Sequence, residues 1–140
     1  MHHRAATDAD CQLLGELNHQ LIKAEGHRNP MTPPELAERM RGWLRNEYAA
    51  RLFVENDDIV AYALYRLQPS EIYLRQLFVV PHRRRQGLGR SAMKALMEEV
   101  WPHGRRLTVD VLTNNPAAVD FWRSIGYRDY CLTLEITPPV

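Results

Sequence analysis

Apolar residues near the start of the chain recur at intervals of three and four, the spacing of an amphipathic helix that buries one face. In residues 11–24 this stripe consists of Leu13, Leu14, Leu17 and Leu21. A second helix is predicted after Thr32, because a threonine cap, prolines in the first turn and Glu35 three residues after the cap form a helix-start signature. The pattern therefore predicts two helices, the first of them ended by Gly26.

The pattern between residues 51 and 80 changes to that of strands. Two β-rich runs, residues 51–55 and 59–67, are joined by the polar residues 56–58, which predicts a hairpin. Residues 72–80 form a third apolar run, and Pro81 ends it because proline has no N–H to donate to a strand ladder. Three strands in succession are therefore expected here.

Helical spacing returns in residues 87–100, ahead of a fourth predicted strand at residues 106–112. A strand, a helix and a strand in that order suggest a crossover unit. Residues 116–125 predict a further helix, and residues 130–137 predict a last strand. Because helices and strands mix throughout the chain without a linker, we expect one α/β domain of mixed α+β character spanning residues 1–140.

Charge and composition remove several classes of function. The chain has 18 Lys and Arg against 17 Asp and Glu, a net charge of +1, which argues against an electrostatic nucleic-acid binder. Its two cysteines, Cys11 and Cys131, and its histidines show no metal-ligand spacing, so no metal is implied. Because no apolar run reaches signal-peptide or membrane-spanning length, we expect a soluble cytoplasmic protein without a membrane partner.

The most informative stretch joins the third strand to the next helix. It runs from Pro81 to Arg90 and contains several arginines and two glycines, Gly87 and Gly89. Backbone N–H groups in the first turn of a helix have no intrahelical partner and suit a phosphate, and glycines let an anion approach them. The sequence therefore predicts an anion site, with a solvated surface turn as the alternative.

A formal dinucleotide fingerprint is also present, because Gly87, Gly89 and Ala92 satisfy G-x-G-x-x-G/A. In that fingerprint the strand runs almost directly into the first glycine, whereas residues 81–86 intervene here. Too few strands follow for a doubly wound sheet, and no Gly-Lys-Ser/Thr marks a Walker loop. Both of these nucleotide-binding loops are therefore disfavoured.

The chain resembles the GNAT superfamily of acyl-CoA-dependent N-acetyltransferases at two motifs. The family's phosphate signature, Q/R-x-x-G-x-G/A, is matched by Arg84, Arg85, Gln86, Gly87, Leu88 and Gly89. Its N-x-x-A-x-x-F-Y-x-x-L-G-F helix is followed by Asn115, Ala118, Phe121, Trp122, Ile125, Gly126 and Tyr127. The two motifs occur in the family's order and make the resemblance specific over residues 72–127.

This resemblance implies a mixed, mostly antiparallel central sheet flanked by helices, which splays open between its two central strands to hold acetyl-CoA. It also implies which residues bind this cofactor. They are the strand residues Leu77, Phe78, Val79 and Val80, the loop residues Arg84, Arg85, Gln86, Gly87, Leu88, Gly89 and Arg90, and the downstream residues Asn115, Ala118 and Trp122.

Acyl transfer needs a deprotonated amine, stabilisation of the carbonyl oxygen and a proton for the departing thiolate. Asp110 is the candidate base, with a structural salt bridge or a solvent-facing position as the alternative interpretation. Trp122 stands where the family usually has a tyrosine that protonates the thiolate, and an indole has no comparable acidic proton. Either the thiolate leaves unassisted, or another hydroxyl such as that of Tyr127 or Tyr130 supplies the proton.

The resulting hypothesis is an acetyl-CoA-dependent N-acetyltransferase that acetylates a primary amine of a small molecule or peptide by direct attack in a ternary complex. The alternative is a non-catalytic CoA-binding sensor or interaction module, motivated by Trp122. The resemblance places the acceptor wall in residues 21–44, where Glu25 and His27 are polar candidates. Residues 130–137 are a candidate strand for pairing across a homodimer.

Overall fold

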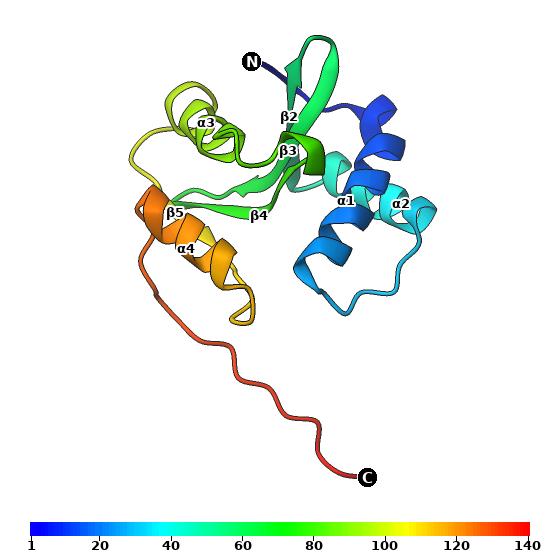
Figure 1. The fold of residues 1–140 in the computed structure, drawn as a ribbon, viewed down its shortest axis with the longest axis vertical. Coiled ribbons are helices and arrows are strands. Elements are labelled where there is room, and N and C mark those ends of the chain that lie inside the picture. Colours follow the sequence, from blue (N-terminus) through cyan, green and yellow to red (C-terminus); the bar gives the residue numbers. More distant parts are fainter. The chain divides into compact units, whose positions relative to one another are not determined.

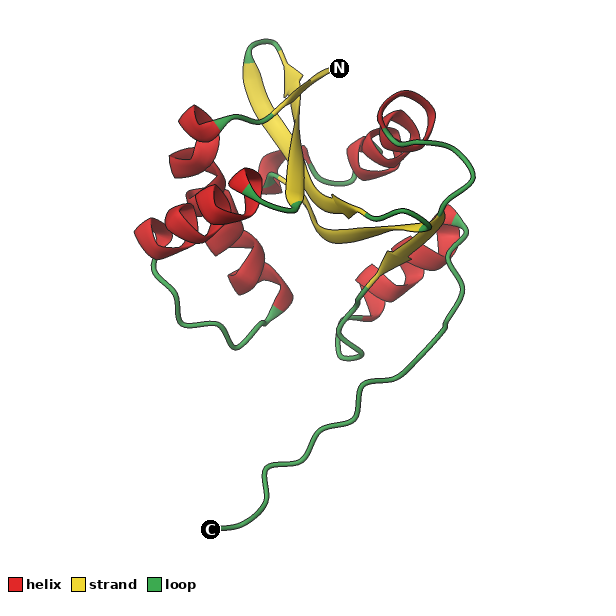
Figure 2. Cartoon of the chain, turned by 180° about the vertical axis from the view of Figure 1, so that it is seen from behind, coloured by secondary structure: helices red, strands yellow, loops and turns green.

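The structure is a computed structural model that describes all residues from 1 to 140. In it the chain forms two compact units, Met1–Asp110 and Val111–Val140. The first unit contains one sheet (Figures 1 and 2). Its strands are β1 (His2–Ala5), β2 (Tyr48–Glu55), β3 (Asp58–Leu67), β4 (Glu71–Val79) and β5 (Arg106–Val109). Neighbours along the chain are neighbours in space, and every pair is antiparallel except β4 with β5. This arrangement confirms the predicted mixed, mostly antiparallel sheet.

The hairpin predicted from the polar turn is the one formed by β2 and β3. Asn56 and Asp57 have positive φ angles of 51° and 66°, which fit the tight two-residue turn that joins them. Asn and Asp tolerate this backbone conformation better than other side chains do. On β3, residues 60–65 are all buried, as expected for a strand that is covered on both faces.

Helices α1 (Cys11–Glu25) and α2 (Pro33–Arg45) lie together on one face of the sheet, and α3 (Leu88–Ala95) lies on the other (Figures 1 and 2). The helix-start signature before α2 is confirmed. The Thr32 hydroxyl accepts a hydrogen bond from the Glu35 N–H, and the Glu35 carboxylate accepts one from the Thr32 N–H at 2.9 Å. These bonds satisfy backbone donors that the first turn of a helix leaves free.

Gly15 lets α1 approach α2 closely. A Cβ atom at Gly15 would lie 2.7 Å from the backbone N of Ala37 and from the backbone O of Pro33, and neither atom can turn away as a flexible side chain can. Gly15→Ala is therefore expected to lower the free energy of unfolding by about 1–3 kcal/mol, the usual cost of overpacking. Urea unfolding followed by circular dichroism measures this loss.

Gly42 provides the matched control, because it lies exposed within α2 and a Cβ atom there meets nothing within 4 Å. Gly42→Ala is expected to raise the free energy of unfolding by about 1 kcal/mol, since alanine is the better helix former. Equal effects of the two substitutions would contradict the close approach at Gly15.

The sheet opens where β5 leaves β4. β5 pairs only with residues 71–74, so residues 75–79 of β4 have no neighbouring strand on that side. Arg75 lies at this boundary and is the extra residue of a β-bulge, because Leu74 and Gln76 oppose two consecutive residues of β3. A bulge bends its strand and increases its local twist. The splay expected between these two strands is therefore present.

Some boundaries differ from those predicted by the sequence. The strand expected at residues 106–112 ends at Val109, because its ladder with β4 ends there. The helix expected at residues 87–100 is divided into α3 and a π-helical turn, η3 (Leu96–Val100). Strand β1 was not predicted, since its short sequence, His-His-Arg-Ala, lacks the apolar alternation of a strand.

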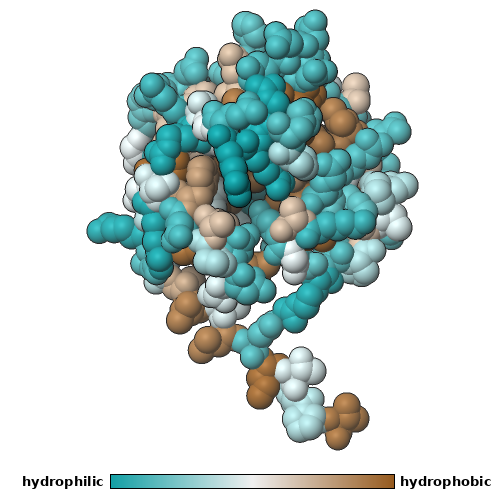
Figure 3. All heavy atoms as spheres, in the orientation of Figure 1, coloured by the Kyte–Doolittle hydropathy of each residue, from teal (hydrophilic) through white to brown (hydrophobic).

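The second unit begins with α4 (Pro116–Ile125), which has the predicted bounds. The strand predicted at residues 130–137 is wrong, because this segment has no strand structure. A strand requires a neighbour for its backbone hydrogen bonds, and no strand pairs with this segment. Its apolar side chains are exposed instead (Figure 3): Tyr130 by 84%, Leu132 by 74%, Leu134 by 85% and Ile136 by 83%.

None of the helices has the length and apolar character needed to cross a membrane. The structure also has no group of three or more His, Cys, Asp or Glu side chains that could hold a metal ion. That the whole chain forms a single domain stays a prediction.

Candidate active site

Most residues of the loop between β4 and α3 are exposed. It passes through a short 3-10 turn, η2 (Pro81–Arg83), and then adopts positive φ at Arg85 (63°) and Gly87 (75°). Gly87 is the N-cap residue of α3, and no side chain caps this helix. Its first-turn N–H groups therefore remain open to an external acceptor, which is what a phosphate requires.

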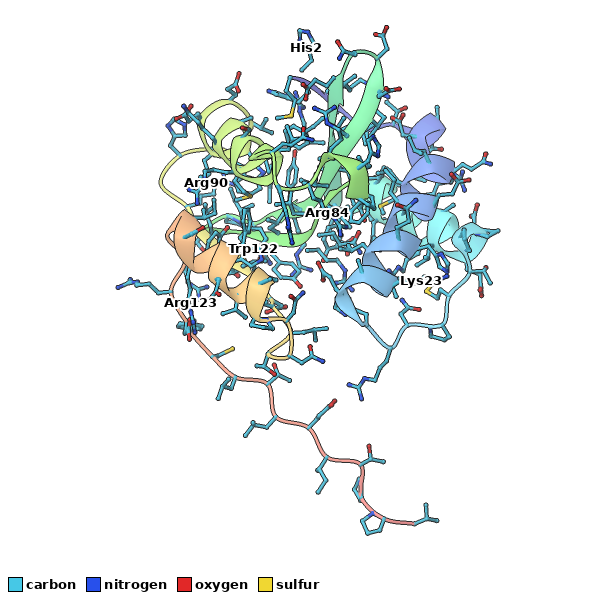
Figure 4. All side chains as sticks on the ribbon, in the orientation of Figure 1. His2, Lys23, Arg84, Arg90, Trp122 and Arg123 are labelled. Atoms are coloured by element: carbon cyan, nitrogen blue, oxygen red, sulfur yellow. The ribbon has the colours of Figure 1, made fainter.

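The arginines of this loop have different partners. Arg83 forms an ion pair with Glu55 at 3.1 Å and donates to Gln86 at 3.0 Å, so it holds the loop to the sheet. Arg84 donates from Nε to the Val79 carbonyl at 2.9 Å, and its guanidinium lies 5.2 Å from the centre of the Phe78 ring (Figure 4). No carboxylate neutralises Arg84, so its positive charge lies at the end of β4, next to the loop.

The predicted strand residues lie at the open part of the sheet. Leu77, Phe78 and Val79 pair with β3 on one side, whereas their other backbone edge has no neighbouring strand. Backbone N–H and C=O groups on such an edge can bind an extended ligand. Val80 differs, because its N–H already donates to the Val60 carbonyl at 2.9 Å.

Asp110 directly follows β5, at the same opening, and its side chain is tied to β4. The Tyr73 hydroxyl donates a hydrogen bond to Asp110 Oδ2 at 2.9 Å. Burial, and then the hydrogen bond to Asp110, raise the pKa of Tyr73 to about 12, so this hydroxyl remains a donor at neutral pH. The partner of Asp110 is thus a tyrosine and not the cation of a salt bridge, and Asp110 itself is exposed, as the solvent-facing alternative expected. Tyr73 is half-buried.

Guanidinium groups and aromatic rings alternate in a stack beside this opening, which we call the arginine–aromatic ladder. In order along the stack, its members are Arg39, Trp43, Arg75, Tyr48, Arg66 and Tyr73. They come from α2, β2, β3 and β4. Because its last member donates to Asp110, the ladder extends from α2 to the point where β4 and β5 separate.

Distances within the ladder are short enough for cation–π attraction. The guanidinium carbons of Arg39 and Arg75 lie 4.4 and 4.6 Å from the centre of the Trp43 ring. Arg75 lies 5.9 Å from the Tyr48 ring. Arg66 lies 5.5 Å from the Tyr48 ring and 5.7 Å from the Tyr73 ring.

The sequence by itself gives almost no sign of this ladder. Arg39 and Trp43 are four residues apart on one helix, which was the only local signal. The other contacts join residues that lie on different helices or strands. Glu25 and His27, the polar residues singled out in this region, form a hydrogen bond with each other at 2.9 Å.

In the second unit, the predicted cofactor residues have local structural roles. The Asn115 side chain caps α4 by accepting a hydrogen bond from the Ala118 N–H at 3.3 Å. Trp122 (Figure 4) packs edge-on against Phe121 and Tyr127, with ring centres 4.9 and 5.4 Å apart. Contact of these residues with a cofactor stays a prediction.

The two hydroxyls considered as proton donors differ in their surroundings. The Tyr127 hydroxyl is buried without a hydrogen-bond partner, and burial raises its pKa to about 12. Tyr130 is 84% exposed. Of the two, only Tyr127 has the shielded hydroxyl that a proton donor in a closed site would need.

A mixed sheet that opens between two parallel strands, beside a glycine loop with an uncapped helix, is the arrangement that the resemblance to acyl-CoA-dependent acyltransferases implies. The sequence profile of the Acetyltransferase (GNAT) family matches residues 16–127. The chain belongs to this family, as its two motifs indicated.

Similar proteins include enzymes with different acceptors. A [Ribosomal protein bS18]-alanine N-acetyltransferase of Escherichia coli K12 is 30% identical over 85 residues, which is 60% of this chain and 57% of that enzyme. A thialysine N-epsilon-acetyltransferase of Sus scrofa is 28% identical over 90% of this chain and 83% of that enzyme. The chain therefore matches little more than half the length of the E. coli enzyme.

Solved structures share the fold. A protein of Bacillus halodurans, crystallised as a tetramutant, has a TM-score of 0.82 at 25% identity and covers 99% of this chain and 100% of its own. An aminoglycoside N-acetyltransferase in complex with CoA has a TM-score of 0.77 at 12% identity and covers 99% of this chain and 95% of its own.

Proposed function

We propose that this protein is an acetyl-CoA-dependent N-acetyltransferase that acetylates a primary amine of a small molecule or peptide. The observation that carries the proposal is the open part of the sheet next to the loop that ends at Gly87, where α3 begins without a side-chain cap. The relatives support the reaction class, because their names give an alanine, a thialysine and aminoglycosides as sites of N-acetylation.

The residues present fit a CoA pyrophosphate. Gly87 has the positive φ that turns the chain into α3, and the N–H groups of the first helical turn supply donors. The guanidinium of Arg84 adds positive charge without a competing carboxylate. Bound acetyl-CoA supplies a thioester whose carbonyl carbon accepts the amine. In our proposal, residues 85–90 bind its phosphates and the free edge of residues 77–79 holds its extended arm.

The chemistry proceeds by direct attack. The amine nitrogen forms a bond to the acetyl carbon, the C–S bond breaks, and the electron pair leaves on the thiolate. Asp110 accepts the proton from the amine, directly or through a water, while the Tyr73 hydroxyl orients it. A backbone N–H at the free edge of β4 donates to the carbonyl oxygen as negative charge develops there. Trp122 takes no part in proton transfer.

Calorimetric titration with acetyl-CoA and with CoA, followed by an amine panel monitored for free thiol, tests this function. We expect both ligands to bind and thiol to appear only when an amine is present. Binding without thiol release across the panel would favour the CoA-binding sensor, and no binding would overturn the proposal. The cytoplasmic location and the absence of nucleic-acid and membrane partners stay predictions.

We also propose that the protein forms a homodimer through residues 130–137. An exposed segment with four large apolar side chains is unusual for a monomer, and Tyr130, Leu132, Leu134 and Ile136 share one face if the segment is extended. Light scattering is expected to show a dimer for the chain and a monomer for a variant ending at Asp129. Leu134→Glu should have the same effect as the truncation, whereas Thr133→Glu, on the opposite face, should leave the dimer intact.

A further inference from the structure

The arginine–aromatic ladder gathers positive charge that the protein itself does not neutralise. None of its three arginines forms an ion pair with a carboxylate. Arg39 donates to Asn18 Oδ1 at 3.2 Å, and Arg75 donates to the Tyr48 hydroxyl at 3.4 Å, so both have neutral partners. Nearby acids are occupied elsewhere, Glu38 by Arg41 and Glu71 by Arg106.

Arg39 and Arg75 are also close enough to repel each other. Burial, and then the positive charge of Arg75, lower the pKa of Arg39. In a chain whose net charge is only +1, such an accumulation is local rather than a property of the whole surface. An anion bound between these two groups would relieve their repulsion and gain charge-assisted hydrogen bonds.

Three hydrogen-bond donors in or next to the ladder lack partners, two of them at its Arg39 end and one at Arg66. The Nε atoms of Arg39 and Arg66 are buried without an acceptor, and so is Nδ2 of Asn18, a residue with no exposed surface. Because Arg39 donates to Oδ1 of Asn18, the amide group of that side chain must direct its N–H groups elsewhere. All three unpaired groups are donors. They therefore match a ligand that only accepts hydrogen bonds, which is the property of a carboxylate.

The two ends of the ladder differ in charge. One end has the guanidinium groups of Arg39 and Arg75 against Trp43, and the other end has Tyr73 bound to Asp110. An acceptor whose anionic group lies at the first end would present its amine toward the carboxylate at the other. This separation of charge is complementary to an amine that carries a carboxylate.

We infer that the ladder binds a carboxylate of the acceptor, so that the substrate is an amino-acid-like compound rather than a purely cationic amine. This inference rests on the proposed acetyltransferase function and assigns the substrate class of the same site. Arg39 and Arg75 bind the carboxylate, and Trp43 and Tyr48 hold the guanidinium groups in place.

Matched acceptors that carry or lack a carboxylate test the inference. Lysine with lysinamide and 6-aminohexanoate with 6-aminohexanamide compare the carboxylate with its neutral amide at a distance from a terminal amine, and phosphoethanolamine with ethanolamine compares a phosphate with no anion. With saturating acetyl-CoA, thiol release is expected to give each amino acid a kcat/KM at least 10-fold above that of its amide, through KM. This factor equals about 1.4 kcal/mol. Phosphoethanolamine should gain less over ethanolamine.

Variants connect this preference to the ladder. Arg39→Gln and Arg75→Gln are each expected to reduce the ratio between amino acid and amide to about twofold or less, by raising KM for the amino acid. Retained affinity for CoA shows that the variants fold. Arg41→Gln is the matched control, because Arg41 also lies on α2 but is paired with Glu38, and its ratio should equal that of the wild type.

Equal rates for amino acids and amides, a larger gain from phosphate, or a ratio unchanged in both ladder variants would each overturn the inference. If no amine releases thiol, the proposed function fails, and calorimetry still decides the inference. Lysine should then bind the CoA-loaded protein at least 10-fold more tightly than lysinamide, and Arg39→Gln should abolish the difference. No detectable binding of either compound would overturn the inference as well.

Discussion

Asp110→Asn is expected to lower kcat by about 10²- to 10⁴-fold, the usual contribution of a positioned general base. Asparagine has nearly the same shape and keeps an oxygen that can accept the hydrogen bond from Tyr73, so the loss should reflect the carboxylate's ability to take a proton. The affinity for CoA, measured by calorimetry, should not change. Thiol release with the best amine of the panel gives kcat.

A pH profile separates the base from a structural carboxylate. As the pH approaches the pKa of a lysine-type amine, about 10, more of the acceptor is already deprotonated and needs no base. The activity of Asp110→Asn should therefore recover partly toward high pH. A deficit that is the same at every pH would contradict the assignment of Asp110 as the base.

Two further variants control for this experiment. Tyr73→Phe removes the hydrogen bond to Asp110 but keeps the carboxylate, and a far smaller loss of kcat is expected. Asp58→Asn changes an exposed carboxylate at the start of β3 and should have no effect. If Tyr73→Phe cost as much as Asp110→Asn, the hydrogen bond rather than the carboxylate would be the important feature.

Gly87→Val is expected to weaken the binding of CoA by about 10- to 100-fold, which equals about 1.4–2.8 kcal/mol. Gly87 has a φ of 75°, a conformation that is strained for every L residue and most of all for a β-branched one. A Cβ atom there meets no protein atom within 4 Å, so the valine would occupy the open space that our proposal assigns to the phosphate. Calorimetry with CoA measures the loss.

Gly104 is a matched control for backbone strain. It has a φ of 82°, lies in the turn before β5, and a Cβ atom added there would also meet no protein atom within 4 Å. Gly104→Val should destabilise the fold to a similar extent but leave the affinity for CoA unchanged. Equal affinities for CoA in the two variants and the wild type would remove the phosphate loop from the proposal.

Local patterns were sufficient to predict most of the elements. The helix-start signature at Thr32 and the polar turn at Asn56 and Asp57 depend on contacts within a few residues, and both form as predicted. The loop that ends at Gly87 could also be predicted locally, because the strand before it, its glycines and the start of the helix after it are adjacent in the sequence.

Predictions that depended on a distant partner were less successful. The alternation in residues 130–137 predicts a strand, but no neighbouring strand pairs with it. Strand β1 exists only through its pairing with β2, and its own four residues have no strand pattern. Strand β5 ends where β4 turns away, which the apolar residues that follow Val109 do not reveal.

The order of residues alone thus determines the family, the glycine loop before α3 and the alternation of helices and strands, because each depends on chemistry between near neighbours. The arginine–aromatic ladder and the contact between Tyr73 and Asp110 depend on the folded chain. Their residues come from five elements or element ends, and only the pairing of the strands, the bulge at Arg75 and the packing of α2 bring them together. The features to which we assign the selection of the acceptor therefore arise from long-range packing, which no local pattern records.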